Sequence, residues 1–288
     1  MVAPKKIVKR HLWVNLGLAA LVAALGWLVF FKPEAPSDTV LHKLSTLSAA
    51  QIDSIRITPA NQPRIELRKR QNAWFITEPF QARADATRIE SLLGLLTAQS
   101  EKRIVTKDLT QFELDKPLAR LTLGSQEFAF GATQPLSNQL YVHTQGAVYL
   151  ISPVYFIDAA QPAQAFISKQ LLADDEIPVG FEFARFTLTR DNGTWRMTPP
   201  TGAPTQDAAN AFADEWRHAL ARTVSQPADF KGTERIVLVF ASGKKLTLQA
   251  AQQAQEWVIV REDEKLAYHF SLEAAQRLLD PRPVLLTP

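Results

Sequence analysis

Cysteine is absent from this chain of 288 residues. Its absence excludes disulfides, thiol nucleophiles, thiolate zinc sites and lipid attachment through an N-terminal cysteine. Glycine is scarce, with 11 residues, and neither a glycine-rich phosphate loop nor a Gly-x-Ser-x-Gly nucleophile turn occurs. The sequence therefore predicts a protein that is not an enzyme and that has no catalytic residue, cofactor or metal site.

Acidic residues are missing from positions 1–32, which hold five of the 32 Lys and Arg residues. The remaining 27 basic residues are outnumbered by 29 acidic ones. The pI near 9.1 therefore reflects one basic end and not a basic body. Since a body without excess positive charge is poorly suited to a polyanion, we expect no nucleic-acid partner.

Charge is also absent from Leu12–Phe31, an apolar run interrupted by Asn15 and two glycines. As a helix this run would extend roughly 30 Å, the thickness of a bilayer core. Four basic residues precede it and only Lys32 follows closely. The positive-inside rule then predicts a single-pass protein of the bacterial inner membrane, with residues 1–11 in the cytoplasm and the body in the periplasm.

A cleaved signal peptide is the alternative interpretation of this segment. Val22, Ala23 and Ala24 form a small-residue site of the kind that signal peptidases cleave. The apolar run continues past that site as far as Phe31, whereas a cleavage site normally lies in a polar stretch beyond a shorter apolar region. This continuation favours retention of the segment as a signal anchor.

An internal repeat organises the rest of the chain. Asn72–Pro79 recurs as Gly193–Pro200 at an offset of 121 residues, with a tryptophan and a proline in matching places. In each copy we expect a strand, a helix opening at Asp85 or Asp207, and then hairpins turning at 124–125 and 145–146 or at 242–243 and 262–264. The expected stripe of the second helix is Phe212, Trp216 and Leu220.

The predicted fold class is therefore α+β, with an N-terminal transmembrane helix followed by two repeated antiparallel-sheet-plus-helix units. The predicted organisation is a cytoplasmic stub and transmembrane anchor (1–32), a linker (33–51), a first α+β repeat unit (52–170), a junction (171–180) and a second α+β repeat unit (181–288).

Several motifs resemble one known family. They are Leu44–Leu47, Trp74–Thr77 with Pro79, the helix at Asp85, and Asp108–Pro117 ahead of Leu121–Gly124. Together they make the chain similar to the membrane-anchored bacterial proteins called domain of unknown function 4340, from about Leu44 to the C-terminus. The resemblance implies this architecture and an envelope location, without an activity. It also suggests an ABC-type transporter as partner, and it implies a differently built turn at Glu113, where the family usually carries glycine.

Histidines are the first candidates for chemistry. His143 and His269 lie in expected strands, and no pair of histidines has the spacing of metal ligands. We expect each to be a hydrogen-bonded or edge histidine and not a catalytic base. His218 is expected to face solvent from the second helix.

Carboxylates and tryptophans are the remaining candidates. Asp174, Asp175 and Glu176 could bind a hard cation, but they lack the spaced acids and central glycine of a calcium loop, which favours a solvated linker. Trp74 and Trp195 could stack on a sugar, although their inward-facing strand positions favour a place in the core.

Three functional hypotheses follow. The first is a periplasmic scaffold or accessory subunit of an envelope or transporter complex. The alternative is a periplasmic ligand-binding module that holds a glycan or lipid between the two units. A hydrolase with an unrecognised site is the third.

Overall fold

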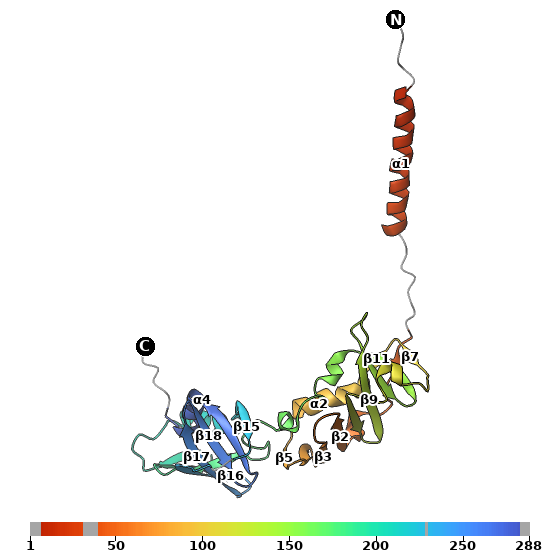
Figure 1. Cartoon of the computed structure of the whole chain (residues 1–288). Coiled ribbons are helices and arrows are strands. Elements are labelled where there is room, and N and C mark those ends of the chain that lie inside the picture. The colour runs from red at the N-terminus through yellow and green to blue at the C-terminus, as the bar shows by residue number, and fades with distance from the viewer. Residues whose placement is uncertain (1–6, 31–39, 228–229, 283–288) are drawn as a thin grey trace. The chain divides into compact units, whose positions relative to one another are not determined.

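The computed structural model describes residues 7–30, 40–227 and 230–282 (Figure 1). The chain divides into two compact units, one ending at Leu41 and the other starting at His42. The first unit contains helix α1 (Ile7–Phe30). The second contains the sheets and the remaining helices.

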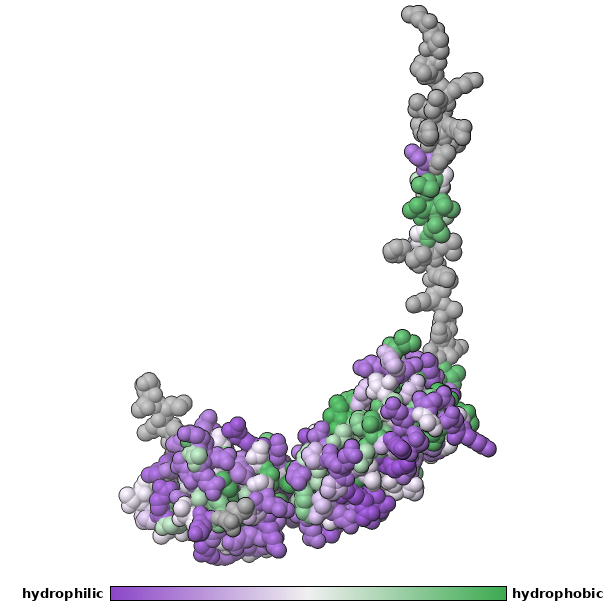
Figure 2. Space-filling model, viewed as in Figure 1, coloured by the Kyte–Doolittle hydropathy of each residue, from purple (hydrophilic) through white to green (hydrophobic). Residues whose placement is uncertain are grey.

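Helix α1 exposes apolar residues on all sides, and Figure 2 shows their hydrophobic colouring. Among the residues that the structure describes, no helix is both long and apolar enough to cross a membrane. The prediction of a transmembrane helix is therefore wrong.

Antiparallel sheet dominates the second unit. Within the described residues, a two-stranded sheet pairs β1 (His42–Lys43) with β6 (Gln99–Ser100). A nine-stranded sheet has the order β5-β4-β3-β2-β8-β9-β10-β11-β7. Its strands are β2 (Ser54–Pro59), β3 (Ile65–Arg70), β4 (Ala73–Glu78), β5 (Ala82–Arg83), β7 (Arg103–Ile104), β8 (Ala119–Leu123), β9 (Gln126–Thr133), β10 (Leu140–Thr144) and β11 (Ala147–Ile151).

An eight-stranded sheet follows along the chain, in the order β14-β13-β12-β16-β17-β18-β19-β15. Its strands are β12 (Pro178–Glu182), β13 (Thr187–Asp191), β14 (Thr194–Thr198), β15 (Thr223–Ser225), β16 (Glu234–Phe240), β17 (Lys245–Gln253), β18 (Glu256–Arg261) and β19 (Leu266–Ser271). The two large sheets share one connectivity, since β2 lies between β3 and β8 as β12 lies between β13 and β16.

Helices are short in this unit. They are α2 (Ala86–Gly94), α3 (Gln206–Arg217) and α4 (Leu272–Leu279), with 3-10 turns η1 (Ala49–Gln51), η2 (Leu95–Thr97), η3 (Thr110–Phe112), η4 (Pro153–Phe156) and η5 (Ala163–Phe166). The predicted fold class, α+β with a transmembrane helix and two sheet-plus-helix units, is therefore wrong. The described protein is mostly antiparallel sheet, arranged in three sheets with four helices. The predicted boundaries at 52, 171 and 181 stay predictions.

Local sequence explains where the helices begin. Asp85 caps α2 by accepting a hydrogen bond from the Arg88 backbone N–H at 3.2 Å. Helix α3 is capped by Thr205, whose Oγ1 accepts from the Ala208 N–H. The second helix therefore starts before the predicted opening residue Asp207, because the threonine hydroxyl satisfies the free N–H of that turn.

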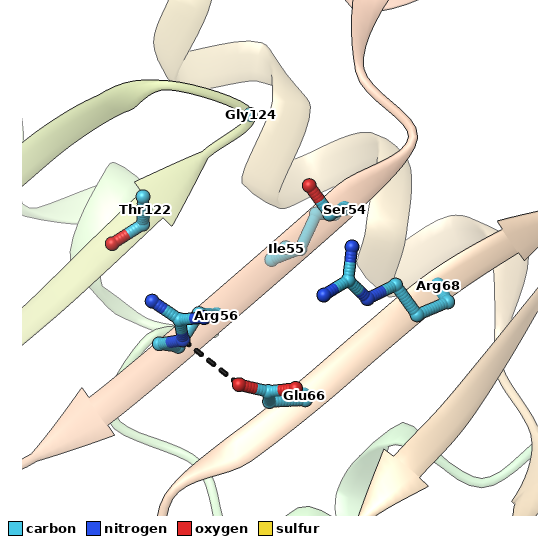
Figure 3. Close-up of a pocket in the computed structure, with 7 residues that line it drawn as sticks. All are labelled: Ser54, Ile55, Arg56, Glu66, Arg68, Thr122 and Gly124. Carbon is cyan, nitrogen blue, oxygen red and sulfur yellow. Dashed lines mark hydrogen bonds and ion pairs between the residues drawn. The ribbon is translucent and has the colours of Figure 1, made fainter.

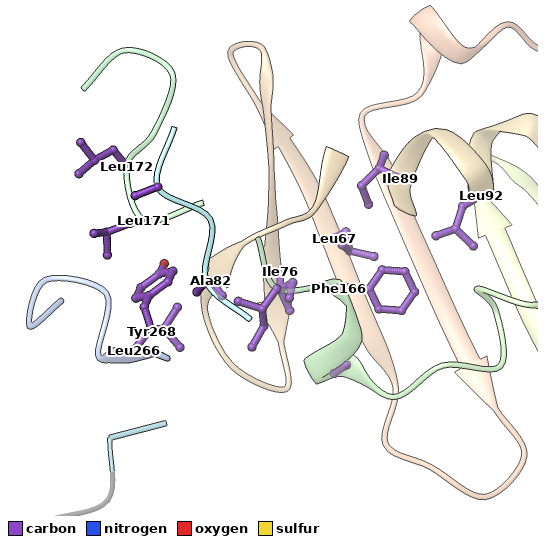
Figure 4. Close-up of a cluster of buried hydrophobic side chains, with 14 of the residues drawn as sticks. Leu67, Ile76, Ala82, Ile89, Leu92, Phe166, Leu171, Leu172, Leu266 and Tyr268 are labelled. Atoms are coloured by element: carbon purple, nitrogen blue, oxygen red, sulfur yellow. The ribbon is translucent and has the colours of Figure 1, made fainter. Parts of the chain in front are cut away.

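One hydrophobic core runs through the second unit and includes residues of both large sheets. Figure 4 shows part of this core. Side chains from β3, β4 and α2 belong to the same cluster as Leu171 and Leu172 and as Leu266 and Tyr268 of β19. Leu171 and Leu172, in the segment that joins the two sheets, therefore lie inside the core.

Candidate functional site

The segment between the two large sheets differs from the solvated linker that the sequence predicts. Leu171 and Leu172 are buried, and Glu176 is only 7 % exposed. Asp174 and Asp175 are exposed, as expected for a surface turn. The linker prediction is wrong at Glu176 because a buried guanidinium binds its carboxylate.

That guanidinium belongs to Arg261, the last residue of β18, which is 2 % exposed. Its Nη1 and Nη2 donate to the two Glu176 carboxylate oxygens at 2.7 and 3.0 Å. Nη1 also donates to the Leu171 carbonyl at 2.7 Å, and Nη2 donates to Asp263 at 2.8 Å. Paired donors of this kind suit the planar fork of arginine.

A second arginine reaches the same segment from the other sheet. Arg83 of β5 donates from Nε to Glu264 Oε1 at 2.6 Å and from Nη2 to the carbonyls of Gln170 and Leu171 at 2.7 and 3.1 Å. Its Nη2 also donates to the Tyr268 hydroxyl, which in turn donates to Glu264 Oε2 at 2.6 Å. One arginine from each sheet therefore binds the Leu171 carbonyl. We call Arg83, Arg261 and their partners the arginine clamp.

Electrostatics in the arginine clamp favour the charged forms. Burial by itself would raise the pKa of Glu176, but the hydrogen bonds and charge of Arg261 outweigh burial and hold that pKa below its usual value. Burial would likewise lower the pKa of Arg261, and its carboxylate partners raise it instead. Burial raises the pKa of the Tyr268 hydroxyl, so this group stays protonated.

The arginine clamp is a group of mutually paired side chains that is suited to holding the structure together. Among the described residues, every buried side-chain nitrogen or oxygen atom has a hydrogen-bond partner. No group of three His, Cys, Asp or Glu side chains in the described ranges is placed to hold a metal ion. The carboxylates here are neutralised by guanidinium groups, which leaves no carboxylate poised as a general base.

A cleft of about 400 Å³ lies beside the clamp. The residues that line it include Trp74, Arg83, Asp85, Lys169, Asp174 and Leu220. Leu220 was expected in the buried stripe of the second helix, but it is 64 % exposed. Helix α3 ends at Arg217, so the helical period that would bury Leu220 does not continue that far.

A second depression, on the sheet of β2, β3 and β8, is too small for an organic ligand. Figure 3 shows Arg56 and Glu66 across its floor, joined by an ion pair of 2.9 Å. Its volume of about 40 Å³ admits little more than water. Half-exposed ion pairs of this kind contribute little to stability.

His218 and His269 have the surroundings that the sequence suggests, whereas His143 lies in a strand that is paired on both sides. His143 is half-buried in β10, and His218 is exposed just after α3. His269 of β19 has partners on both ring nitrogens: Ser225 Oγ lies 2.9 Å from Nε2, and Glu256 Oε1 lies 2.8 Å from Nδ1. It is therefore a hydrogen-bonded histidine.

Sequence reasoning missed the grouping of Ser225, His269 and Glu256, because their strands meet only in the folded sheet. The order of contacts matches that of a serine hydrolase triad. Ser225 is exposed on edge strand β15, however, whereas a triad works in a site that excludes water and supplies donors to an oxyanion. The arginine clamp and its cleft form the better-defined site.

Comparison with family models gives a match that covers residues 74–227, more than half of the chain. The model is described as domain of unknown function (DUF4340). The chain belongs to this family. The DUF4340 match begins at Trp74 and includes Arg83, Glu176 and most of the residues that line the cleft. It is shorter than the resemblance predicted from the sequence, which started near Leu44.

The DUF4340 turn at Glu113 has a φ of 55°. Glutamate there adopts the left-handed conformation that glycine adopts most readily, so the change keeps a glycine-type backbone. Comparison with curated proteins and with solved structures gives no match.

Proposed function

We propose that this protein is a non-catalytic scaffold or accessory subunit of a bacterial envelope complex, with its body in the periplasm. The observation that carries the proposal is the buried seam between the two large sheets. The seam combines apolar residues with the arginine clamp, so the two sheets are held together through their interior. Preorganised surfaces lose less conformational entropy on binding, which suits a protein that presents contacts to a partner.

The N-terminal unit suggests where the partner is. Leu16, Leu18, Leu21, Val22 and Leu25 of α1 are each more than half exposed, and the basic cluster before residue 11 adds positive charge. Exposed apolar surface beside basic residues suits contact with an anionic lipid surface or with a membrane protein. We therefore propose association with the inner membrane and a membrane protein, such as an ABC-type transporter, as the partner.

Affinity purification tests the proposal. The full chain, tagged at the C-terminus and purified in mild detergent, is expected to retain a membrane protein that mass spectrometry identifies. A chain that lacks residues 1–39 is the matched control, and its recovery of that partner should fall if the N-terminal segment brings the two together. Purification of the full chain without a membrane protein would contradict the proposal.

The periplasmic location has its own test. Alkaline phosphatase fused to the C-terminus should be active, because this enzyme matures only outside the cytoplasm. An inactive phosphatase fusion, together with a bright cytoplasmic fluorescent fusion at the same position, would place the body on the other side of the membrane.

A further inference from the structure

Trp195 is a buried tryptophan whose polar groups all have hydrogen-bond partners. It is 4 % exposed and lies in β14. Its Nε1 donates to Asn210 Oδ1 at 2.9 Å, and its ring lies 5.9 Å from the ring of Phe181. The side chain of Gln206, the first residue of α3, accepts a hydrogen bond from the Trp195 backbone N–H and donates one to the Trp195 carbonyl. Trp195 therefore belongs to the core.

Trp74 occupies the corresponding place in the other large sheet, since β4 pairs with β3 as β14 pairs with β13. It is only half-buried, with part of its ring against the core. None of the described residues accepts a hydrogen bond from its Nε1. Because every buried side-chain nitrogen in the described part of the chain has a partner, this Nε1 reaches solvent. Trp74 therefore lines the cleft of about 400 Å³ and keeps an Nε1 donor that is free to bind a ligand.

Polar groups surround this indole. Asn72, Lys169 and Asp174 are exposed in the lining, and no described residue forms an ion pair with the last two. Asp85 uses Oδ1 to cap α2, which leaves its second oxygen as an acceptor. Arg83, in contrast, is committed to the clamp. The free groups are thus a mixture of donors and acceptors without a net positive charge.

We propose that this cleft binds a saccharide. An aromatic ring that offers its face and a polar N–H suits the apolar C–H face and hydroxyl groups of a sugar ring. The surrounding amide, ammonium and carboxylate groups fix the orientation of hydroxyls, which need donors and acceptors together. A cleft volume of about 400 Å³ lies within the range of roughly 300 to 1,000 Å³ that is typical of small-ligand sites.

Charge and shape separate this proposal from other ligand classes. A phosphorylated or polyanionic ligand would need an excess of positive charge, and this lining holds two carboxylates, Asp85 and Asp174, besides Lys169. A lipid chain would need a continuous apolar channel, but exposed polar side chains interrupt this lining. The saccharide site goes beyond the scaffold role and does not depend on it.

Calorimetric titration of the full chain in mild detergent tests the site, with chitotetraose and maltotetraose as probes. At least one probe should bind saturably at concentrations up to about 10 mM, in the range of weak single-site binding. Trp74→Ala should weaken that binding by roughly tenfold or more, as expected for loss of a stacking platform. Trp74→Phe, which keeps a ring, should retain most of the affinity.

Three exposed positions make the test independent of folding. Lys169→Ala and Asp174→Ala change the lining, so each should weaken binding several-fold without a change in Tm. Asp175→Ala changes an exposed neighbour that does not line the cleft, and it should bind as the wild type does. Failure of both probes to bind saturably would overturn the proposal, as would unchanged affinity in Trp74→Ala or in both lining variants.

Discussion

At the scale of residues, Glu176 carries the clearest electrostatic signature. Its carboxylate is buried, and Arg261 holds its pKa below the usual value. A carboxyl group whose folded-state pKa is lowered adds stability above its unfolded-state pKa, near 4.3. That stability is lost as pH falls through the lower, folded-state pKa. The clamp should therefore weaken in acid.

Glu176→Gln tests this assignment. At pH 7 we expect a loss of about 3 kcal/mol in the free energy of unfolding, because Arg261 stays buried with one charged partner fewer. The difference from wild type should shrink as pH falls below about 4, where the unfolded wild-type carboxyl binds its proton. Chemical denaturation between pH 7 and 3 measures both effects. Asp175→Asn, at the exposed neighbouring acid, is the control, and an equal loss there would contradict the assignment.

Sequence patterns were informative for single residues only where the partner is near in the chain. The sequence predicts that Glu176 belongs to an acidic linker. Its partner Arg261 lies 85 residues away, and only the folded sheets bring the two together. Trp74 and Trp195 look equivalent in sequence, but Asn210 of α3 satisfies only Trp195. Burial and polar contacts set by the tertiary structure decide such cases.

At the scale of elements, period-two patterns predicted strands well. The hairpin expected around Gly124 is β8–β9, where Leu121 pairs with Phe128. The hairpin expected around Gly243 is β16–β17, where Leu238 pairs with Leu246. Alternation succeeds here because one face of each strand is buried and register is therefore fixed.

Helix ends were predicted less well. Thr205 caps α3 in place of the expected Asp207, and α3 ends before Leu220. Several polar residues near a helix start can each serve as a cap, so the sequence leaves that choice open.

The apolar run at the N-terminus suggested a transmembrane span that the described helices do not support.

Trp74 of β4 and Trp195 of β14 give a matched pair of variants for measuring the free energy of unfolding. Trp195→Ala should lower the free energy of unfolding by roughly 3 to 5 kcal/mol, because it empties a buried site and leaves Asn210 without its donor. Trp74→Ala should cost less, roughly 1 to 2 kcal/mol, since this ring is already partly in solvent. Urea denaturation at one pH compares the two variants. Equal losses would mean that Trp74 is a core residue.

At the scale of the whole molecule, the central claim is that the two large sheets act as one body. Their shared connectivity would let each sheet close a core of its own, but the buried core includes residues of both. Arg83 and Arg261 reinforce that core from opposite sheets through one backbone carbonyl, that of Leu171. A scaffold built in this way keeps the surfaces of both sheets in a fixed relation.

Differential scanning calorimetry of the full chain tests this claim most directly. If the seam couples the sheets, heating should produce a single unfolding transition whose calorimetric and van't Hoff enthalpies agree. Arg83→Met should lower the Tm of that transition without dividing it, because the apolar part of the seam remains. Two separate transitions in the wild-type protein, each with the enthalpy of about half the chain, would contradict the account.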